Sequence, residues 1–271
     1  STMRPSRIKA KLQRNDPALV TCLHLTDPSV HELTSLMGFD GIWLDMEHHG
    51  YSLETATGLM RAARSGASDI VCRPAKGEFM RMQRMLEAGA QAIMYPRCDD
   101  AQEAAEVVKW MKFPPWGERG FDGGNPDMPY CTMPMVEYVR QANEETLLVL
   151  QIEQPKTVEH VEEIAAVDGV DVLFVGKGDL SLQSGVPGQM DHESIRDAIR
   201  KTAQAAKNAG KHWGCPSGSM EQTQELLEMG ARFIAHQADI IMIKNALEKI
   251  QRDFSPLGFT FDNRLDPAST S

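Results

Sequence analysis

Several features are scarce in this chain of 271 residues, and each scarcity excludes a class of protein. No apolar run approaches the roughly 20 residues that a helix needs to span a bilayer. The five cysteines form no C-x-x-C, so neither a disulfide framework nor a zinc ribbon is indicated, and we expect reduced thiols. A formal net charge of -10 provides no general attraction for phosphate backbones or anionic lipids. We therefore expect neither a nucleic acid nor a membrane as partner.

Motifs of several common enzyme classes are also missing. The sequence contains no G-x-x-x-x-G-K-[ST] and no G-x-S-x-G. The pairs Gly123-Gly124 and Gly176-x-Gly178 lack the rest of a dinucleotide fingerprint, so NAD binding is not supported. Residues 1–11 are basic without the apolar core of a signal peptide, and we expect a cytoplasmic protein.

What the chain does contain is a series of apolar runs separated by helix-length segments. The runs are nearly continuous rather than alternating, which is typical of strands covered on both faces. They span residues 18–25, 41–47, 69–74, 92–96, 147–153, 171–176, 212–216 and 232–237. Eight such units in a chain of this length predict one (β/α)₈ TIM barrel over about residues 15–254, with a C-terminal tail over 255–271.

Glycines mark the ends of the predicted helices in a repeated way. We expect each to take a left-handed conformation just before the next strand. The six are Gly38, Gly66, Gly89, Gly169, Gly210 and Gly230. Met80, Met82, Met85 and the tract 240–243 are interpreted as the apolar faces of helices packed in the core.

Two carboxylates stand where neighbouring predicted strands end. Glu153 closes a Gln-x-Glu sequence and Asp179 closes Gly-x-Gly-Asp. The carboxyl ends of parallel strands meet at one edge, and hard oxygen ligands there suit Mg²⁺ or Mn²⁺. The alternative is that each acid only caps the next helix. Gly176 and Gly178 would let the backbone approach a bound ligand closely.

Two further strand ends carry reactive side chains. Asp45 and His48 lie at the end of the second run. His48 and His49 would point to opposite faces there, so at most one faces the barrel mouth. We assign Asp45 and His48 a catalytic role, although a histidine near an acid is often structural. Arg73 ends the third run and is interpreted as a clamp for a carboxylate or an enolate oxygen, the alternative being a surface ion pair.

Together these motifs resemble the HpcH/HpaI aldolase family, the class II pyruvate aldolases. The matching segments occur in order between about residues 15 and 255. They are Trp43-Leu44-Asp45-x-Glu47-His48, Arg73-Pro74, Leu86-Glu87-Ala88-Gly89-Ala90, Pro114-x-x-Gly117-x-Arg119-Gly120, Gln151-Ile152-Glu153 and Gly176-x-Gly178-Asp179-Leu180-Ser181.

The resemblance implies a set of roles. Glu153 and Asp179 would bind Mg²⁺, Mn²⁺ or Co²⁺, Arg73 would stabilise a pyruvate enolate, and His48 would act as acid and base with Glu87, where Asp is frequent in the family. Expected substrate contacts are Trp43, Arg73, Phe121, Gln151, Gly176, Gly178 and Pro216. Lys177 departs from the family's usual Gly-Pro-x-Asp, which puts the fine substrate geometry in question. A homohexamer, a pair of trimers joined by an exchanged C-terminal helix over 239–254, is also implied.

The expected reaction is metal-dependent cleavage of a 4-hydroxy-2-oxo acid into pyruvate and an aldehyde, or the reverse. An enolate formed by loss of CO₂ would instead make the chain an oxaloacetate decarboxylase or another carbon–carbon bond-forming enzyme. A Schiff base is not required, although Lys177 is the lysine to examine for that route. A third alternative is a barrel without catalytic activity. The Pro- and Gly-rich segment 113–126 is interpreted as a lid, an interface segment or a disordered loop, and segment 114–130 and the surroundings of Pro216 would select the aldehyde.

Overall fold

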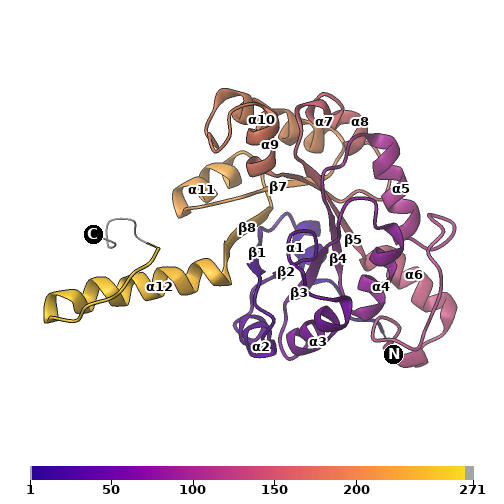
Figure 1. Ribbon diagram of the computed structural model, residues 1–271. Helices are drawn as coiled ribbons and strands as arrows, with labels where there is room; N and C mark the ends of the chain where they lie inside the picture. Colours follow the sequence, from indigo (N-terminus) through magenta and orange to yellow (C-terminus); the bar gives the residue numbers. More distant parts are fainter. Residues whose placement is uncertain (1, 266–271) are drawn as a thin grey trace.

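The computed structural model describes residues 2–265 and confirms the (β/α)₈ barrel. Each strand pairs in parallel with the next along the chain, and β8 pairs with β1 to close the sheet (Figure 1). Every strand overlaps one of the predicted runs. The strands are β1 (Ala18–Leu23), β2 (Gly41–Asp45), β3 (Asp69–Arg73), β4 (Ala92–Tyr95), β5 (Leu147–Ile152), β6 (Val172–Val175), β7 (His212–Pro216) and β8 (Phe233–Ala238).

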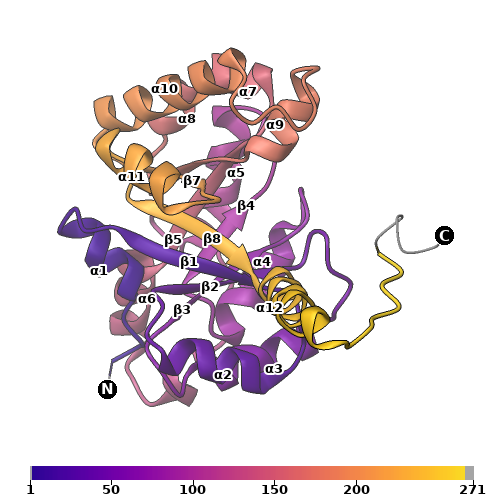
Figure 2. The same ribbon diagram turned by 90° about the vertical axis from the view of Figure 1, so that its left-hand side faces the viewer.

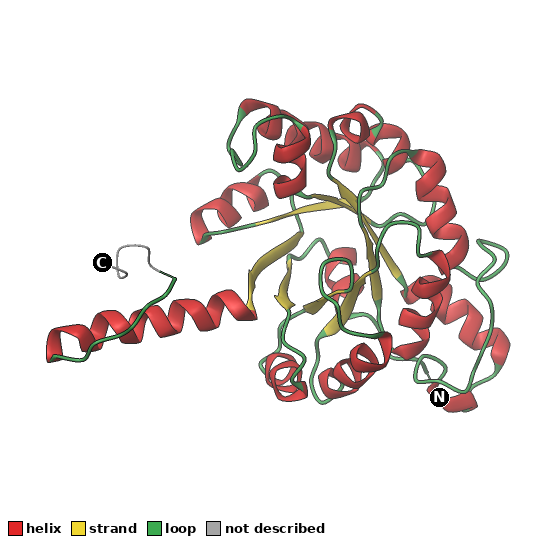
Figure 3. Cartoon of the chain, viewed as in Figure 1, coloured by secondary structure: helices red, strands yellow, loops and turns green. Residues whose placement is uncertain are grey.

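Helices surround these strands, as the red and yellow elements of Figure 3 show. They are α1 (Arg7–Gln13), α2 (Pro28–Leu36), α3 (Leu53–Ala63), α4 (Phe79–Ala88), α5 (Ala101–Met111), α6 (Met135–Glu145), α7 (Pro155–Glu159), α8 (Val161–Ala165), α9 (Lys177–Gln183), α10 (Glu193–Asn208), α11 (Met220–Glu228) and α12 (Asp239–Phe254), with short 3₁₀ turns η1 (Pro129–Cys131) and η2 (Ser255–Leu257). In the part of the chain that is described, no helix combines the length and apolarity needed to cross a membrane.

Polar side chains cap the starts of several helices. Asp27, Ser52, Asp100 and Ser219 each accept a hydrogen bond from a backbone N–H in the first turn of α2, α3, α5 and α11. These bonds satisfy donors that have no partner within the helix. These helices therefore begin at a residue whose side chain caps the first turn.

The inside of the barrel follows from the alternation of side chains along each strand. Val71, Val149, Phe174 and Phe233 point inward and pack into one buried cluster. Intervening residues such as Leu148 point outward into a larger cluster beneath the helices. Since both faces are covered, the strands are apolar throughout, and this is why their runs are continuous.

Helix α1 closes the end of the barrel at which the strands begin. The carboxylate of Asp69, the first residue of β3, accepts hydrogen bonds from Ser6 Oγ at 2.7 Å and from the backbone N–H groups of Arg7 and Ile8 at 3.0 and 2.9 Å. Burial raises the pKa of Asp69 to about 6. Ile8 and Leu12 of the same helix are buried against the interior cluster, so the floor of the barrel is filled.

Five of the six helix-end glycines have the expected positive φ, and Gly66 does not. A Cβ at Gly66 would overlap the backbone carbonyl of Ser35. Gly66 is therefore required by the close approach of the segment after α3 to α2, and the predicted left-handed conformation is wrong at this position.

This contact predicts a local effect on stability. We expect Gly66→Ala to lower the free energy of unfolding by about 1–3 kcal/mol, because the backbone of α2 has to move. Gly58→Ala inside α3 is the matched control, since a Cβ there meets nothing within 4 Å, and it should stabilise by up to about 1 kcal/mol. Urea unfolding of the two variants measures both effects, and an unchanged Gly66→Ala would contradict the packing argument.

The last helix leaves the barrel instead of packing on it. Figure 1 shows α12, in yellow, extending away from the strands, and Figure 2 views it nearly end-on. Residues Ile240, Ile241, Met242 and Ile243 are 40–45% exposed, so their predicted place in the core is wrong within this chain. Met80 is also exposed, at 60%, whereas Met82 and Met85 are buried as expected. The tail is described as far as residue 265, and the rest of the predicted tail lies outside the described residues.

The long Pro- and Gly-rich segment lies at the closed end of the barrel. It follows α5, which runs back from the strand ends, and it precedes α6 and β5. Arg119 anchors it: its Nη2 donates to Asp127 at 3.0 Å and to the hydroxyl of Tyr138 at 3.2 Å. The guanidinium also stacks on Phe113 at 4.5 Å. Phe113, Arg119 and Asn125 are buried and hold the segment in place, and in its own chain it is not a lid over the strand ends.

Candidate active site

Inward-pointing polar side chains replace the apolar ones at the ends of three strands. Asp45 of β2 and Arg73 of β3 are partners in the parallel register. Gln151 of β5 takes the same inward direction two residues after Val149, and Glu153 follows two residues later. The period of two along each strand therefore brings all four together at the mouth of the barrel.

Arg73 is the centre of this arrangement and is 7% exposed. Its Nε and Nη2 donate to the two oxygens of Asp45 at 2.9 and 2.6 Å, and its Nη1 donates to Gln151 Oε1 at 3.2 Å. The guanidinium also stacks over the Trp43 ring at 4.6 Å. The guanidinium is thus held by Asp45, Gln151 and Trp43 and presents a fixed positive charge at the mouth of the barrel.

Asp45 is occupied in holding that arginine. Burial alone would raise the pKa of Asp45, but the hydrogen bonds and charge of Arg73 outweigh it and keep the pKa below its usual range. The backbone N–H groups of Glu47 and His48 also donate to Asp45, at 3.0 and 3.3 Å. Such a carboxylate is a poor base, so the geometry favours a positioning role for Asp45 over the predicted direct one.

Glu153 is a buried carboxylate beside a second acid. Burial raises the pKa of Glu153 to about 7; Arg97 and Arg73 lower it, while the charges of Asp179 and Glu47 raise it further. Its Oε2 accepts the backbone N–H of Arg97 at 2.9 Å. Asp179, in the first turn of α9, is half-buried and forms no ion pair with any residue from 2 to 265.

This donor set fits a divalent cation. The mouth holds four carboxylates, Asp45, Glu47, Glu153 and Asp179, against the two guanidiniums of Arg73 and Arg97. When all are ionised, two negative charges remain, which a divalent cation would balance. Within residues 2–265 no three His, Cys, Asp or Glu side chains converge on one point, so substrate and water would complete the coordination.

The two glycines of the predicted site differ in what surrounds them. A Cβ at Gly176 would overlap the carboxylate of Glu153, whereas a Cβ at Gly178 would meet nothing within 4 Å. Gly176 therefore makes room for the Glu153 carboxylate, and Gly178 is exposed at the surface of α9.

This difference predicts unequal effects of two similar substitutions. We expect Gly176→Ala to weaken Mn²⁺ binding by about 10- to 100-fold, in the range found when the support of a ligand is disturbed. Gly178→Ala, the matched control, should bind Mn²⁺ as the wild type does. Electron paramagnetic resonance titration of free Mn²⁺ measures both affinities. Equal Mn²⁺ affinities of the two variants would show that the space at Gly176 is not needed to position Glu153.

The two adjacent histidines point in different directions, as expected. The side chain of His48 is 56% exposed, and its Nε2 lies 3.7 Å from Glu47. His49 turns toward the interior, with Nε2 3.8 Å from Asp45 Oδ2 and its ring 3.9 Å from the ring of His24. The catalytic assignment from the sequence went to His48, whereas His49 is the one nearer to the Asp45–Arg73 pair, and His24 had not been singled out.

Arg97 is a second functional candidate that the sequence reasoning missed. It lies two residues after the end of β4 and has a left-handed φ of 47°. Its backbone N–H binds Glu153, and its Nη2 donates to Glu47 at 2.9 Å. Its position just beyond the end of an apolar strand was the available signal, since the neighbouring strand ends all carry site residues.

The structure does not bring every predicted residue to the mouth. Glu87 stands near the far end of the ten-residue helix α4, about 12 Å from its start, and interacts with Gln83. Phe121 packs near Tyr138 at the closed end, with ring centres 6.1 Å apart. Pro216 ends β7 at the mouth, as expected. Glu87 and His48 thus have no route to each other within one chain.

Residues 20–246 match the family model described as HpcH/HpaI aldolase/citrate lyase. The chain belongs to this family. The "Hydroxypyruvate/pyruvate aldolase" of Delftia acidovorans is 34% identical over 88% of each chain. The "2-keto-3-deoxy-L-rhamnonate aldolase" of Escherichia coli is 28% identical over 89% of this chain and 90% of that one.

Solved structures agree with this membership. The HpcH/HpaI aldolase from Desulfitobacterium hafniense superposes with a TM-score of 0.87 at 27% identity, covering 91% of this chain and 95% of that one. Macrophomate synthase shares the fold, with a TM-score of 0.80 at 24% identity and coverage of 93% and 90%. The resemblance read from the sequence motifs is therefore confirmed, and the expected class of enzyme, a carbon–carbon lyase, agrees with the aldolases among these family members.

Proposed function

We propose that this HpcH/HpaI protein is a metal-dependent class II aldolase that cleaves 4-hydroxy-2-oxo acids into pyruvate and an aldehyde, or joins them. The observation that carries the proposal is the fixed guanidinium of Arg73 close to the buried carboxylate of Glu153, so that the two charges interact. A 2-oxo acid has one carboxylate and one polarised carbonyl, and it needs a cation on each side of the enolate that forms.

The residues of the mouth divide this work. Mg²⁺, Mn²⁺ or Co²⁺ held by Glu153 and Asp179 would supply Lewis-acid polarisation of the 2-oxo group. Arg73 would neutralise the charge that develops on the enolate oxygen, in a site where little water competes. Asp45 and Gln151 hold the guanidinium in place, and their hydrogen bonds are already made before substrate arrives.

Proton transfer is assigned to the histidines at the rim. His48 would take the proton from the C4 hydroxyl, directly or through water, as the aldehyde departs. Lys177 lines a cavity beside α10 and α11, which supports a mechanism without a Schiff base. The proposal thus needs no covalent intermediate between enzyme and substrate.

Exchange of the pyruvate methyl protons in D₂O tests the enolate directly. We expect exchange with added Mn²⁺ and its loss after treatment with EDTA, followed by nuclear magnetic resonance. A folded, metal-loaded enzyme that shows no exchange would contradict the aldolase assignment. If that enzyme still turned over oxaloacetate, decarboxylation would be the remaining use of the same residues.

We also propose that α12 packs on a second copy of the chain, as the predicted homohexamer requires. A groove of about 490 Å³ runs between α12 and the segment 261–265 and is lined by apolar residues including Ile243 and Phe261. On the barrel, Leu33 and Leu36 of α2 are 59% and 60% exposed. Contiguous apolar surface of this kind marks an interface, and the exchange of one identical helix would cover both surfaces.

An assembly would also give Glu87 and Phe121 a place in the reaction. Both lie at the closed end of their own barrel, so they can reach a substrate only at the mouth of a neighbouring copy. The interface segment that had been one interpretation of the long loop is thus the option we propose. The free cysteines, of which Cys131 is exposed and the other four are buried, are consistent with the reducing cytoplasm as the location.

Mixing two inactive variants tests the shared site. We expect Glu87→Ala and Arg73→Met each to be inactive, and their co-refolded mixture to regain about a quarter of the wild-type activity. The reason is that half of the sites keep Arg73 and half of those face an intact Glu87. A mixture that stays inactive, while size-exclusion chromatography shows mixed oligomers, would place Glu87 outside the neighbouring site.

A further inference from the structure

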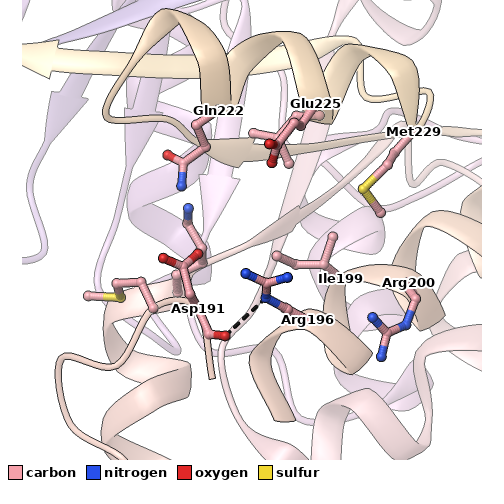
Figure 4. Close-up of a pocket in the computed structure, with 10 residues that line it drawn as sticks. Asp191, Arg196, Ile199, Arg200, Gln222, Glu225 and Met229 are labelled. Atoms are coloured by element: carbon pink, nitrogen blue, oxygen red, sulfur yellow. Dashed lines mark hydrogen bonds between the residues drawn. The ribbon is translucent and has the colours of Figure 1, made fainter. Parts of the chain in front are cut away.

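A second cavity lies outside the barrel mouth, between α10 and α11 and beside the start of α9. It has a volume of about 380 Å³. Figure 4 shows Gln222 and Glu225 on one side of it, on α11, and Arg196 and Ile199 on the other, on α10. Neither the family match nor the proposed reaction gives this cavity a role.

Lys177 lines the cavity from the first turn of α9 and has no polar partner. It is 8% exposed, and within residues 2–265 it makes no hydrogen bond and no ion pair. The acids Asp191 and Glu225 line the same cavity without pairing with it. The ammonium group of Lys177 therefore has no bonded counter-charge in the described part of the chain, and an anion that entered the cavity could pair with it.

Arg196 adds a second cationic group on the opposite wall. Its Nε donates to the backbone carbonyl of Asp191 at 3.0 Å. Figure 4 shows this bond and the guanidinium lying in the space between α10 and α11. Its two terminal nitrogens have no partner among the described residues. Arg200, by contrast, is paired with Glu193 and is not available.

The apolar side chains that line the cavity indicate what kind of anion would fit. Ile199 and Leu226 are buried and lie at the cavity wall. An inorganic oxyanion would fill only the charged end, whereas an organic anion could also bury a short carbon body against these side chains. Carboxylate and phosphate heads share the chemistry that Lys177 and Arg196 recognise.

We propose that this cavity is a second anion-binding site, in which Lys177 and Arg196 hold the carboxylate of a small organic acid and Ile199 and Leu226 contact its carbon body. The site is distinct from the mouth because side chains two positions apart on a helix point in nearly opposite directions. Lys177 therefore faces the cavity while Asp179 faces the mouth.

Such a ligand would influence the reaction through the backbone of α9, which carries Asp179. Lys177 stands between Gly176, which makes room for Glu153, and Asp179. An anion at Lys177 would fix the turn that carries the second proposed metal ligand. This regulatory consequence depends on the proposed metal site, whereas anion binding itself does not.

Calorimetric titration of the metal-free protein, prepared on a chelating resin, tests the site with butyrate and inorganic phosphate as probes. We expect saturable butyrate binding that Lys177→Met weakens by about tenfold or more, equal to about 1.4 kcal/mol. Arg196→Gln should weaken it as well. Lys201→Met removes an exposed lysine of α10 that pairs with Asp197 and should bind butyrate like the wild type.

Each outcome decides the proposal. Phosphate binding as tight as butyrate binding would show an oxyanion site without a contribution from Ile199 and Leu226, and would overturn the assignment to an organic acid. Absence of saturable butyrate binding, or equal binding by Lys177→Met, would overturn the site altogether. Because no metal is present, failure of the aldolase proposal leaves these results unchanged.

Discussion

Replacement of Glu153 by Gln should abolish metal-dependent turnover while leaving the fold intact. The amide keeps the size of the side chain and can still accept the backbone N–H of Arg97, but it removes the negative charge that the cation requires. Removing a residue that merely supports a metal ligand typically lowers metal affinity or activity 10- to 100-fold. For the ligand itself we expect kcat to fall by more than about a hundredfold, together with the loss of Mn²⁺ binding.

The change in charge also separates this variant from a damaged protein. Because burial raises the pKa of Glu153, its neutral replacement should leave the metal-free protein at least as stable as the wild type. Glu162→Gln, an exposed acid on α8, is the matched control and should change neither activity nor stability. Retention of metal-dependent turnover by Glu153→Gln would show that the cation is bound elsewhere.

Replacement of Arg73 by Met should affect both catalysis and stability. Removing one group that stabilises a developing oxyanion typically costs about 10²–10³ in kcat. The same change leaves Asp45 buried without its partner, and breaking a buried ion pair costs about 3–5 kcal/mol. Both effects are measured on the same preparation, by steady-state kinetics of the cleavage and by urea unfolding.

A double variant distinguishes the two effects. In Asp45→Asn with Arg73→Met, the buried charge is gone, so most of the lost stability should return while activity stays low. Arg81→Met, an exposed arginine of α4, serves as the control for removal of a guanidinium. A double variant as unstable as Arg73→Met alone would mean that the Asp45–Arg73 pair does not account for the loss.

The strands and most helix ends could be predicted because their signals are local. A strand covered on both faces must be apolar along its whole length, as in 147–152, and a helix that starts at Asp27 or Ser52 needs an acceptor for its free N–H groups. Gly66 shows the limit of such reasoning, since its glycine is required by the backbone of α2, which no local pattern reveals.

The predictions that differ from the structure do so for a common physical reason. The apolar tract 240–243 predicts burial, but the sequence does not say whether the surface that covers it belongs to the same chain. The same is true of Phe121 and Glu87, which were assigned to a site that lies at the other end of their own barrel. Apolar pattern and motif identify a contact surface, and the three-dimensional arrangement shows that these residues do not make the contact within their own barrel.

Within the mouth, residue identity was easier to predict than residue role. Asp45, Arg73, Gln151 and Glu153 converge because strand register and side-chain alternation place them inward. That Asp45 holds Arg73 depends on distances of a few ångströms, which spacing along the chain does not encode. Arg97 was missed for the same reason, since its contact with Glu153 is made by the backbone.

The filled floor under the strands limits how reactants and products can enter and leave the active site. With Ile8 and Leu12 of α1 packed into the lower end of the barrel, the residues around Arg73 are closed off from that side. Metal, oxo acid, aldehyde and exchanging water would all have to arrive from the side where the strands end, one behind another. The order of binding and release would then follow from how deep each reactant lies. The reactant bound deepest would enter first and leave last, and the inner product could leave only after the outer one had been released.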